Sequence, residues 1–300
     1  MKKKTATEAI QYRRSIRIQS TVEIDSEKVK ACIQNATLAP NSSNMQLWEF
    51  YHISSADGKK AIQEACFNQP AAKTAQQIVI PVVRMDLWES RIQSLKDNLI
   101  QSFEKSSDRN PEKEAKALGY LENQLPKVYA KKSESEAHKQ QEEIEAKGVD
   151  QTVYREVSAA DLRVIGHKSV ALAAQNFMIS MAEIEYDTCP MEGFDSVRIK
   201  TALGLPPSAE INMVIGCGVR AKNGIYGPQF RLPLEQVYFE KYKLIPPTAV
   251  AISYPLIAGL KNFVLLDLSS IPVNSPLLPG YRPWLSAGFQ LLIIEWYPVE

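Results

Sequence analysis

A chain of 300 residues, 45% of them hydrophobic and 23% charged, is long enough for one large domain or two ordinary ones. The formal net charge of +1 creates no overall field, so we expect no nucleic acid and no membrane surface as a partner. Three histidines, and four cysteines without a CxxC pair, predict neither a metal site nor a disulfide framework, and isolated thiols are typical of a reducing compartment. The basic N-terminus has no apolar run behind it, and proline, glycine and lysine interrupt the longest apolar stretch, so we expect a cytoplasmic protein.

Two helices are expected before the first strand. Thr5 and Glu8 have capping-box spacing, which predicts a short helix that carries the arginines after it at its end. Asp25 is a good N-cap for a second helix. The expected buried face of this helix consists of Val29, Cys32, Ile33 and Ala36. Turn formers at 39–44 end it, and residues 47–53 then predict a strand.

Further helices are predicted at 58–66 and 169–184, and further strands at 78–83, 210–219 and 289–296. Pro81 argues against the strand at 78–83, because proline cannot donate a hydrogen bond to a ladder. The segment 169–184 is apolar nearly all round, which predicts a central buried helix. Because the helices and strands do not alternate strictly, we predict an α+β fold.

Residues from about 86 to 158 differ in character from the rest. Between 101 and 150, 20 of 50 residues are charged and few are large and apolar. This composition is typical of solvated helices or of a partly disordered insertion, and a mobile cover over a site is the alternative. We expect one domain over 1–240 that carries this insertion. The extension over 241–300 is expected to pack on the same domain or on a partner subunit.

The densest basic cluster is RRSIR, at 13–17. A guanidinium group binds phosphate oxygens in a bidentate way, and a serine hydroxyl adds a neutral donor. In an extended or helix-end segment Arg13, Ser15 and Arg17 point the same way, which predicts a site for a doubly charged phosphate. The alternative is a basic helix end that meets only solvent.

Three more motifs gather polar or backbone-shaping residues. APNSSNMQLW, at 39–48, either lines the edge of a polar heterocycle with amides and hydroxyls or forms an ordinary turn. In DTCPMEGFD, at 187–195, we expect a loop in which Pro190 and Gly193 turn main-chain amides toward a ligand. Glu192 and Asp195 of this loop are less suited to act as a paired acid and base. The last motif is RLPLEQV, at 231–237.

These four motifs, in this order and spacing, resemble the FMN-dependent nitroreductase family. The resemblance covers residues from about 8 to 83 and 165 to 238, and the charged insertion and the extension lie outside it. It implies a nitroreductase-like α+β fold with a central, mostly antiparallel sheet flanked by helices. It also implies an intertwined homodimer with two FMN sites at the subunit interface.

The resemblance assigns the basic residues to the flavin. Arg13 and Ser15 are expected toward the phosphate, and Arg17 near the pyrimidine edge of the ring. Arg231 is expected to close on the phosphate. A second basic residue that many members carry near RLP is missing here, so the phosphate is expected to rely on Arg14 as well.

The remaining implied contacts come from three other segments. The polar turn is expected to reach the FMN from the other subunit through Asn41, Ser42 and Asn44. The ring edge is expected to meet Asn68, with Gln69 and Lys73 as alternatives. Flavin N5 is expected near the backbone of Pro190, Glu192 and Gly193, with the amides of the last two as donors.

The implied activity is that of an FMN-dependent NAD(P)H oxidoreductase. Such an enzyme reduces nitro-aromatic, quinone or related small oxidised acceptors by two-step hydride transfer through flavin N5, with NADH or NADPH as the donor. No side chain is singled out as catalytic. The alternatives are a specialised flavoenzyme, such as a dehalogenase or a metabolite dehydrogenase, a carrier or sensor that binds FMN without turnover, and a structural protein that has lost the cofactor.

Overall fold

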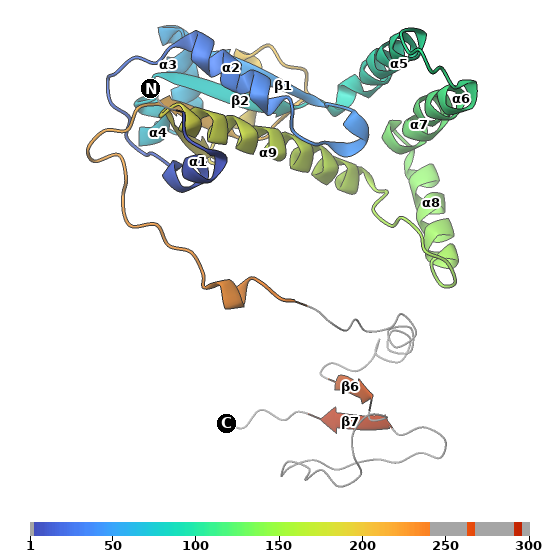
Figure 1. Cartoon of the computed structure of the whole chain (residues 1–300). Helices are drawn as coiled ribbons and strands as arrows, with labels where there is room; N and C mark the ends of the chain where they lie inside the picture. The colour runs from blue at the N-terminus through green and yellow to red at the C-terminus, as the bar shows by residue number, and fades with distance from the viewer. Residues whose placement is uncertain (1–2, 241–262, 268–290, 296–300) are drawn as a thin grey trace. The chain divides into compact units, whose positions relative to one another are not determined.

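The computed structural model describes residues 3–240 and, beyond them, the backbone of two strands at 263–267 and 291–295 (Figure 1). It divides into two units, Met1–Pro228 and Gln229–Glu300. In the second unit, β6 (Phe263–Asp267) and β7 (Leu291–Glu295) form an antiparallel pair, so the strand expected at 289–296 is present. The other residues from 241 onward lie outside the described residues, and the packing of the extension stays a prediction.

The first unit is built on a five-stranded sheet. Its strands are β1 (Trp48–Ile53), β2 (Gln77–Val83), β3 (Asp187–Met191), β4 (Glu210–Ile211) and β5 (Val214–Gly218). Their order is β1-β2-β5-β3, with β4 also paired to β2, and every pairing described within this sheet is antiparallel. Together with the helices, this sheet confirms the predicted α+β fold.

Two strand predictions need correction, and both corrections have a local cause. The strand expected at 210–219 is divided into β4 and β5, because the register of pairing with β2 shifts by one residue between them: Val82 lies opposite Ile211, whereas Val79 lies opposite Ile215. Pro81 is tolerated in β2 because β5 pairs only with residues 77–79 and β4 only with 82–83. Residues 187–191, expected in a loop, form β3 instead, so Pro190 lies in a strand opposite Ile215.

The N-terminal helices follow their capping residues. Helix α1 (Ala6–Tyr12) begins with the predicted capping box of Thr5 and Glu8, and it ends before the arginines. Helix α2 (Ser26–Ala36) begins after Asp25, whose carboxylate accepts a hydrogen bond from the Glu27 amide. Helix α3 (Ala56–Ala65) begins slightly before the expected position, because Ser55 caps it.

The long helix α9 (Ala159–Glu183) confirms the predicted central helix but begins well before 169. A capping box of Ser158 and Asp161 starts it, and its first turns expose Arg163 and Val164. The apolar pattern therefore predicts only the later, mostly buried turns of this helix. No helix in the described part of the chain is long and apolar enough to cross a membrane.

Hydrophobic clusters cover both faces of the sheet, because successive residues of β2 point to opposite sides. Val79 and Val83 pack with residues of α2 and α9, such as Val29 and Phe177. On the other face, the cluster includes Ile78, Ile80 and Val82 of β2. Residues of α3, α4 (Pro70–Lys73) and α10 (Ser196–Ala202) complete it. The sheet thus forms the middle of three layers.

The charged insertion is helical. It contains α5 (Trp88–Glu104), α6 (Pro111–Gly119), a π-helical turn (Tyr120–Gln124), α7 (Leu125–Tyr129) and α8 (Glu134–Lys147). Figure 1 shows these helices beyond the N-terminal end of α9, whereas α1 lies near the other end of α9. Leu121, Leu125 and Tyr129 form a third hydrophobic cluster with Met45 and Leu47, which lie just before β1. The insertion is therefore anchored on the main body by a small core of its own.

An ion-pair cluster at the end of β2 makes stability depend on pH. Arg84 contacts Glu49 and binds Asp86 at 2.9 Å, and the hydrogen bond and charge of Arg84 lower the pKa of Asp86. A carboxyl group whose pKa is lower in the folded protein stabilises the fold at pH values above its ordinary pKa. That stabilisation is lost as the pH falls through the pKa of the folded state. We expect Asp86→Asn to reduce the free energy of unfolding at pH 7 by about 1 kcal/mol, and this difference should shrink as the pH falls below the ordinary carboxyl pKa of 3.8.

Urea unfolding at several pH values measures this difference. The exposed Asp150, changed to asparagine, is the matched control. A loss of stability in Asp86→Asn that stayed constant down to pH 3 would contradict the electrostatic explanation.

Candidate functional site

The arginine segment, residues 13–17, lies along the edge of the sheet that β3 forms. Arg13 is the C-cap of α1 and already has an extended backbone, with ψ at 123°. Ser15 then forms a parallel bridge with Thr188 of β3, and the Ile16 amide donates to the Thr188 carbonyl at 3.1 Å. The prediction that a helix carries the arginines at its end is therefore wrong, since the capping residues fix only where α1 begins.

Backbone contacts from residues 224–227 hold this segment in place. The Arg17 amide donates to the Gly224 carbonyl at 2.8 Å, and the Arg14 guanidinium donates to the Gly227 carbonyl at 2.7 Å. A Cβ on Gly224 would lie 2.4 Å from the Ile18 carbonyl oxygen, which is closer than two such atoms can approach. Gly224 is thus required for the close contact of the two backbones.

The arginine charges gather beside β3. Burial raises the pKa of the Cys189 thiol, and the positive charges of Arg17 and Arg13 oppose that rise, so both guanidinium groups act on the same strand. Among the described residues, no carboxylate forms a salt bridge with Arg14 or Arg17. The charges of Arg14 and Arg17, which no described carboxylate pairs, lie next to the exposed Ser15 and form a donor set that fits a phosphate group.

The start of the segment is anchored by a buried carboxylate that the sequence does not indicate. Asp187 accepts hydrogen bonds from the Arg220 backbone amide at 2.8 Å and from its guanidinium at 2.5 and 3.0 Å. The Arg220 guanidinium also lies 4.1 Å from the centre of the Tyr12 ring and donates to the Tyr12 carbonyl. Tyr12 precedes Arg13, so this ion pair fixes where the arginines begin.

The backbone that follows β3 offers exposed amides. Glu192 and Gly193 are exposed, and within the described residues neither amide donates a hydrogen bond. The Gly193 carbonyl accepts from the Gln69 side chain at 2.6 Å, and the Asp195 amide donates to the Ala65 carbonyl at 2.8 Å. The turn at 192–193 is therefore held on the end of α3, with its amides available to a ligand.

The positions near Asn68 are brought to the same place. Phe67 and Asn68 both have left-handed backbone conformations, with φ at 56° and 54°. The Asn68 side-chain oxygen accepts from Gln63 at 2.9 Å, whereas Gln69 reaches Gly193. The structure thus unites residues 13–17, 68–69 and 190–193 around β3. Whether Asn68, Gln69 or Lys73 meets a ligand stays a prediction.

The polar turn at 41–46 has a strained and well-braced backbone. Ser43, Asn44 and Gln46 have positive φ angles of 52°, 53° and 49°. The Asn41 side-chain oxygen accepts from the Gln46 amide at 2.8 Å, and its amide nitrogen donates to the Ala39 carbonyl. Asn41 therefore braces the turn, while Ser42 and Asn44 are exposed on it.

The polar turn and the arginine segment lie far apart within one chain. Asn41 and Ser42 line a small cavity with Gly166 and Ser169 of α9, whereas Ser15 of the arginine segment pairs with Thr188 of β3, the strand that follows the C-terminal end of α9. From Ser169 to Glu183 the helix rises by roughly 20 Å. One chain thus does not bring Asn41, Ser42 and Asn44 to the arginines. Arg231 belongs to the second unit, where it donates to the Phe230 carbonyl, and its role stays a prediction.

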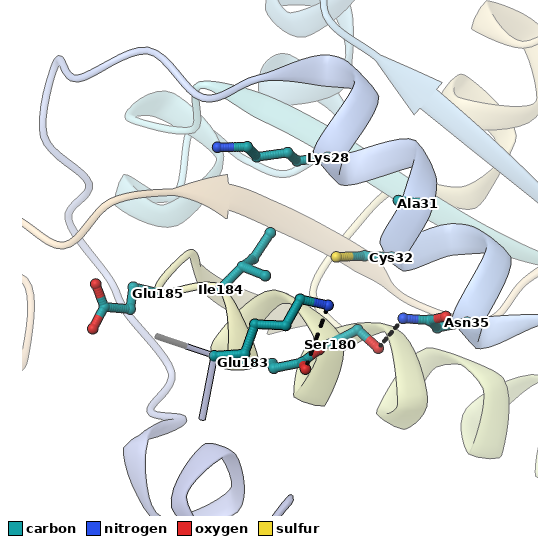
Figure 2. A pocket seen from close by; sticks show the side chains of 9 residues that line it. Lys28, Ala31, Cys32, Asn35, Ser180, Glu183, Ile184 and Glu185 are labelled. Atoms are coloured by element: carbon teal, nitrogen blue, oxygen red, sulfur yellow. Dashed lines mark hydrogen bonds and ion pairs between the residues drawn. The ribbon is translucent and has the colours of Figure 1, made fainter. Parts of the chain in front are cut away.

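A larger cavity lies elsewhere, between α2 and the end of α9 (Figure 2). It has a volume of about 330 Å³ and contains none of the predicted site residues. A Lys3–Glu183 ion pair and the Asn35–Ser180 hydrogen bond lie within it, with Cys32 at its wall. Burial raises the pKa of the Cys32 thiol to about 11, so this group stays protonated near neutral pH. Ser15 and Arg17 of the arginine segment, by contrast, are exposed.

The structure thus defines an antiparallel α+β protein with arginine and serine donors and exposed amides at one edge of its sheet. The sequence profile of the Nitroreductase family matches residues 10–219, so the chain belongs to the nitroreductase family. This match confirms the resemblance drawn from the four motifs.

Two similar protein sequences and one similar solved structure each match most of this chain. The chain is 26% identical to a protein named NADH dehydrogenase from Thermus thermophilus, over 75% of this chain and 90% of that protein. It is 23% identical to Protein DrgA from Synechocystis sp., over 72% and 84% of the two chains. A structure described as a nitroreductase in complex with FMN, from Exiguobacterium sibiricum, has a TM-score of 0.56 and 24% identity, covering 80% of this chain and 99% of its own.

Proposed function

We propose that this protein is an FMN-dependent NAD(P)H oxidoreductase that reduces nitro-aromatic, quinone or related small oxidised acceptors. The observation that carries the proposal is the gathering of the arginine segment, the exposed amides of 192–193 and the loop at 68–69 around β3. Membership of the nitroreductase family supports the same assignment. One neighbour in fold is a complex with FMN, and one relative is named NADH dehydrogenase, which supports the flavin and the nicotinamide donor.

In this proposal each group has a separate task. FMN, when bound, supplies the hydride chemistry between nicotinamide nucleotide and acceptor. Arg13, Arg14 and Ser15 bind its phosphate, and Arg17 places a permanent positive charge near the pyrimidine edge. The amides of Glu192 and Gly193 donate hydrogen bonds toward N5 and orient the ring. These residues bind and orient the cofactor, and none of them transfers a proton.

The separation of the two predicted contact sets supports a homodimer. Because the polar turn lies beside the first half of α9 and the arginine segment beside the strand that follows its C-terminal end, one small cofactor does not span them within a single chain. We propose that the polar turn of a second subunit completes each site, with Asn41, Ser42 and Asn44 approaching the FMN. Such a site is open in one subunit and closes only when two subunits associate, as an isologous dimer allows.

The visible absorption spectrum of the purified protein tests the function directly. We expect the bands of oxidised flavin, and we expect NADH or NADPH to bleach them under nitrogen. Oxygen-free addition of a quinone should then restore them. Bands that neither nucleotide bleaches would favour a carrier or sensor, and a protein that stays colourless after incubation with FMN would overturn the proposal.

A further inference from the structure

The insertion touches the polar turn through two phenol groups. The Tyr129 hydroxyl donates to the Ser42 hydroxyl oxygen at 3.3 Å, and the Tyr120 hydroxyl lies 2.9 Å from the Ser43 hydroxyl. Tyr120 begins the π-helical turn and Tyr129 ends α7, so both residues belong to the charged insertion. Turns of π-helix are uncommon and occur frequently at functional sites.

The packing around these phenols is fixed. Tyr129 is only 7% exposed and lies in the hydrophobic cluster that joins the insertion to the main body. Met45 and Leu47, the main-body residues of this cluster, flank the last residue of the turn. Burial raises the pKa of its phenol, so the hydroxyl remains protonated and able to donate. Tyr120 is 45% exposed, and its hydroxyl contacts the turn at Ser43.

The direction of the Tyr129 hydrogen bond has a chemical consequence. A serine hydroxyl has one hydrogen to donate and lone pairs to accept. Because Tyr129 fills an acceptor position of Ser42, the Ser42 hydrogen is left to point elsewhere, and Ser42 is exposed. A hydroxyl that accepts one hydrogen bond is also polarised into a stronger donor.

We infer that Tyr129 and Tyr120 are positioning residues for the cofactor, by which the insertion sets Ser42 as a hydrogen-bond donor and holds the strained turn in its binding conformation. This inference rests on the proposed function, in which the turn approaches FMN. The insertion is then a brace for the cofactor-binding turn, and its helices influence a site that its own side chains need not enter.

The test compares single-atom changes in the flavin-free protein. Tyr129→Phe removes only the donor to Ser42, and we expect the dissociation constant of FMN to rise roughly fivefold, as for the loss of one neutral hydrogen bond. Tyr51→Phe is the matched control, because its hydroxyl bonds Glu49 at 2.9 Å on β1, away from the turn. It should leave FMN affinity unchanged. Turnover per bound flavin should be the same in all variants.

A double-mutant cycle tests the second contact. Tyr120→Phe and Ser43→Ala each remove one member of the same hydrogen bond, so the double variant should weaken FMN binding no more than either single variant. Hydrogen exchange gives a readout without flavin. Within the turn, the Gln46 amide donates a hydrogen bond to the Asn41 side-chain oxygen. This amide should exchange faster in Tyr129→Phe than in the wild type.

The outcomes separate this inference from the proposed function. If the wild type binds FMN and both phenylalanine variants bind it equally well, the positioning role is overturned while the function stands. If the wild type binds no FMN at all, the function falls and the positioning role falls with it. Weaker binding in Tyr129→Phe, with unchanged Tyr51→Phe and faster exchange at Gln46, supports the inference.

Discussion

The double variant Arg13→Ala/Arg17→Ala is expected to lose its flavin. In the proposed site both guanidinium groups bind anionic or electron-rich edges of FMN beside β3. A hydrogen bond to a charged group contributes about 1.5–3 kcal/mol, so two such losses should raise the dissociation constant of FMN at least about a hundredfold. Flavin fluorescence on titration of the flavin-free protein measures this constant, and the purified variant should be colourless.

A charge-matched control separates specific binding from net charge. Lys30→Ala/Lys60→Ala removes the same two positive charges from exposed positions on α2 and α3. It should bind FMN as the wild type does. A double arginine variant that kept its full flavin would show that the segment at 13–17 serves another purpose. Urea unfolding of the double variant checks that lost flavin does not reflect a lost fold.

Local sequence rules predict the elements but not how they meet. Capping residues such as Thr5 and Asp25 act within one turn of helix, so the starts of α1 and α2 could be predicted. The β3 strand could not, because the motif at 187–195 contains proline and glycine, and the strand forms only through its ladder with β5. Strand formation at such a position depends on tertiary pairing and not on local preference.

The candidate site shows the same limit. The arginines and the 192–193 turn carry recognisable patterns, and the structure brings them together on β3. Their supports have no pattern in the sequence. Asp187 is one of three acids within residues 183–187 and nothing in the sequence distinguishes it, and Tyr129 lies in a charged segment far along the chain from Ser42. Contacts between residues so distant in sequence are fixed by the fold, so only the structure reveals them.

The Asp187–Arg220 pair is the support whose loss should cost the most stability. The Asp187 side chain is 1% exposed and that of Arg220 29%, so removing the acid leaves a guanidinium without its partner in a partly dry environment. We expect Asp187→Asn to lower the free energy of unfolding by roughly 2 to 3 kcal/mol. Glu185→Gln breaks the more exposed pair with Lys4 and should cost less than about 1 kcal/mol.

A cycle with Arg220→Met separates the pair from its surroundings. Each single variant leaves one charged partner unpaired, whereas Asp187→Asn/Arg220→Met removes both charges together, so the double variant should lose less than the sum of the two singles. Urea unfolding measures all three free energies. Because Arg220 also fixes Tyr12, which precedes the arginine segment, each single variant should weaken FMN binding as well. Strictly additive losses, with FMN affinity unchanged, would mean that this pair stabilises the fold without positioning the site.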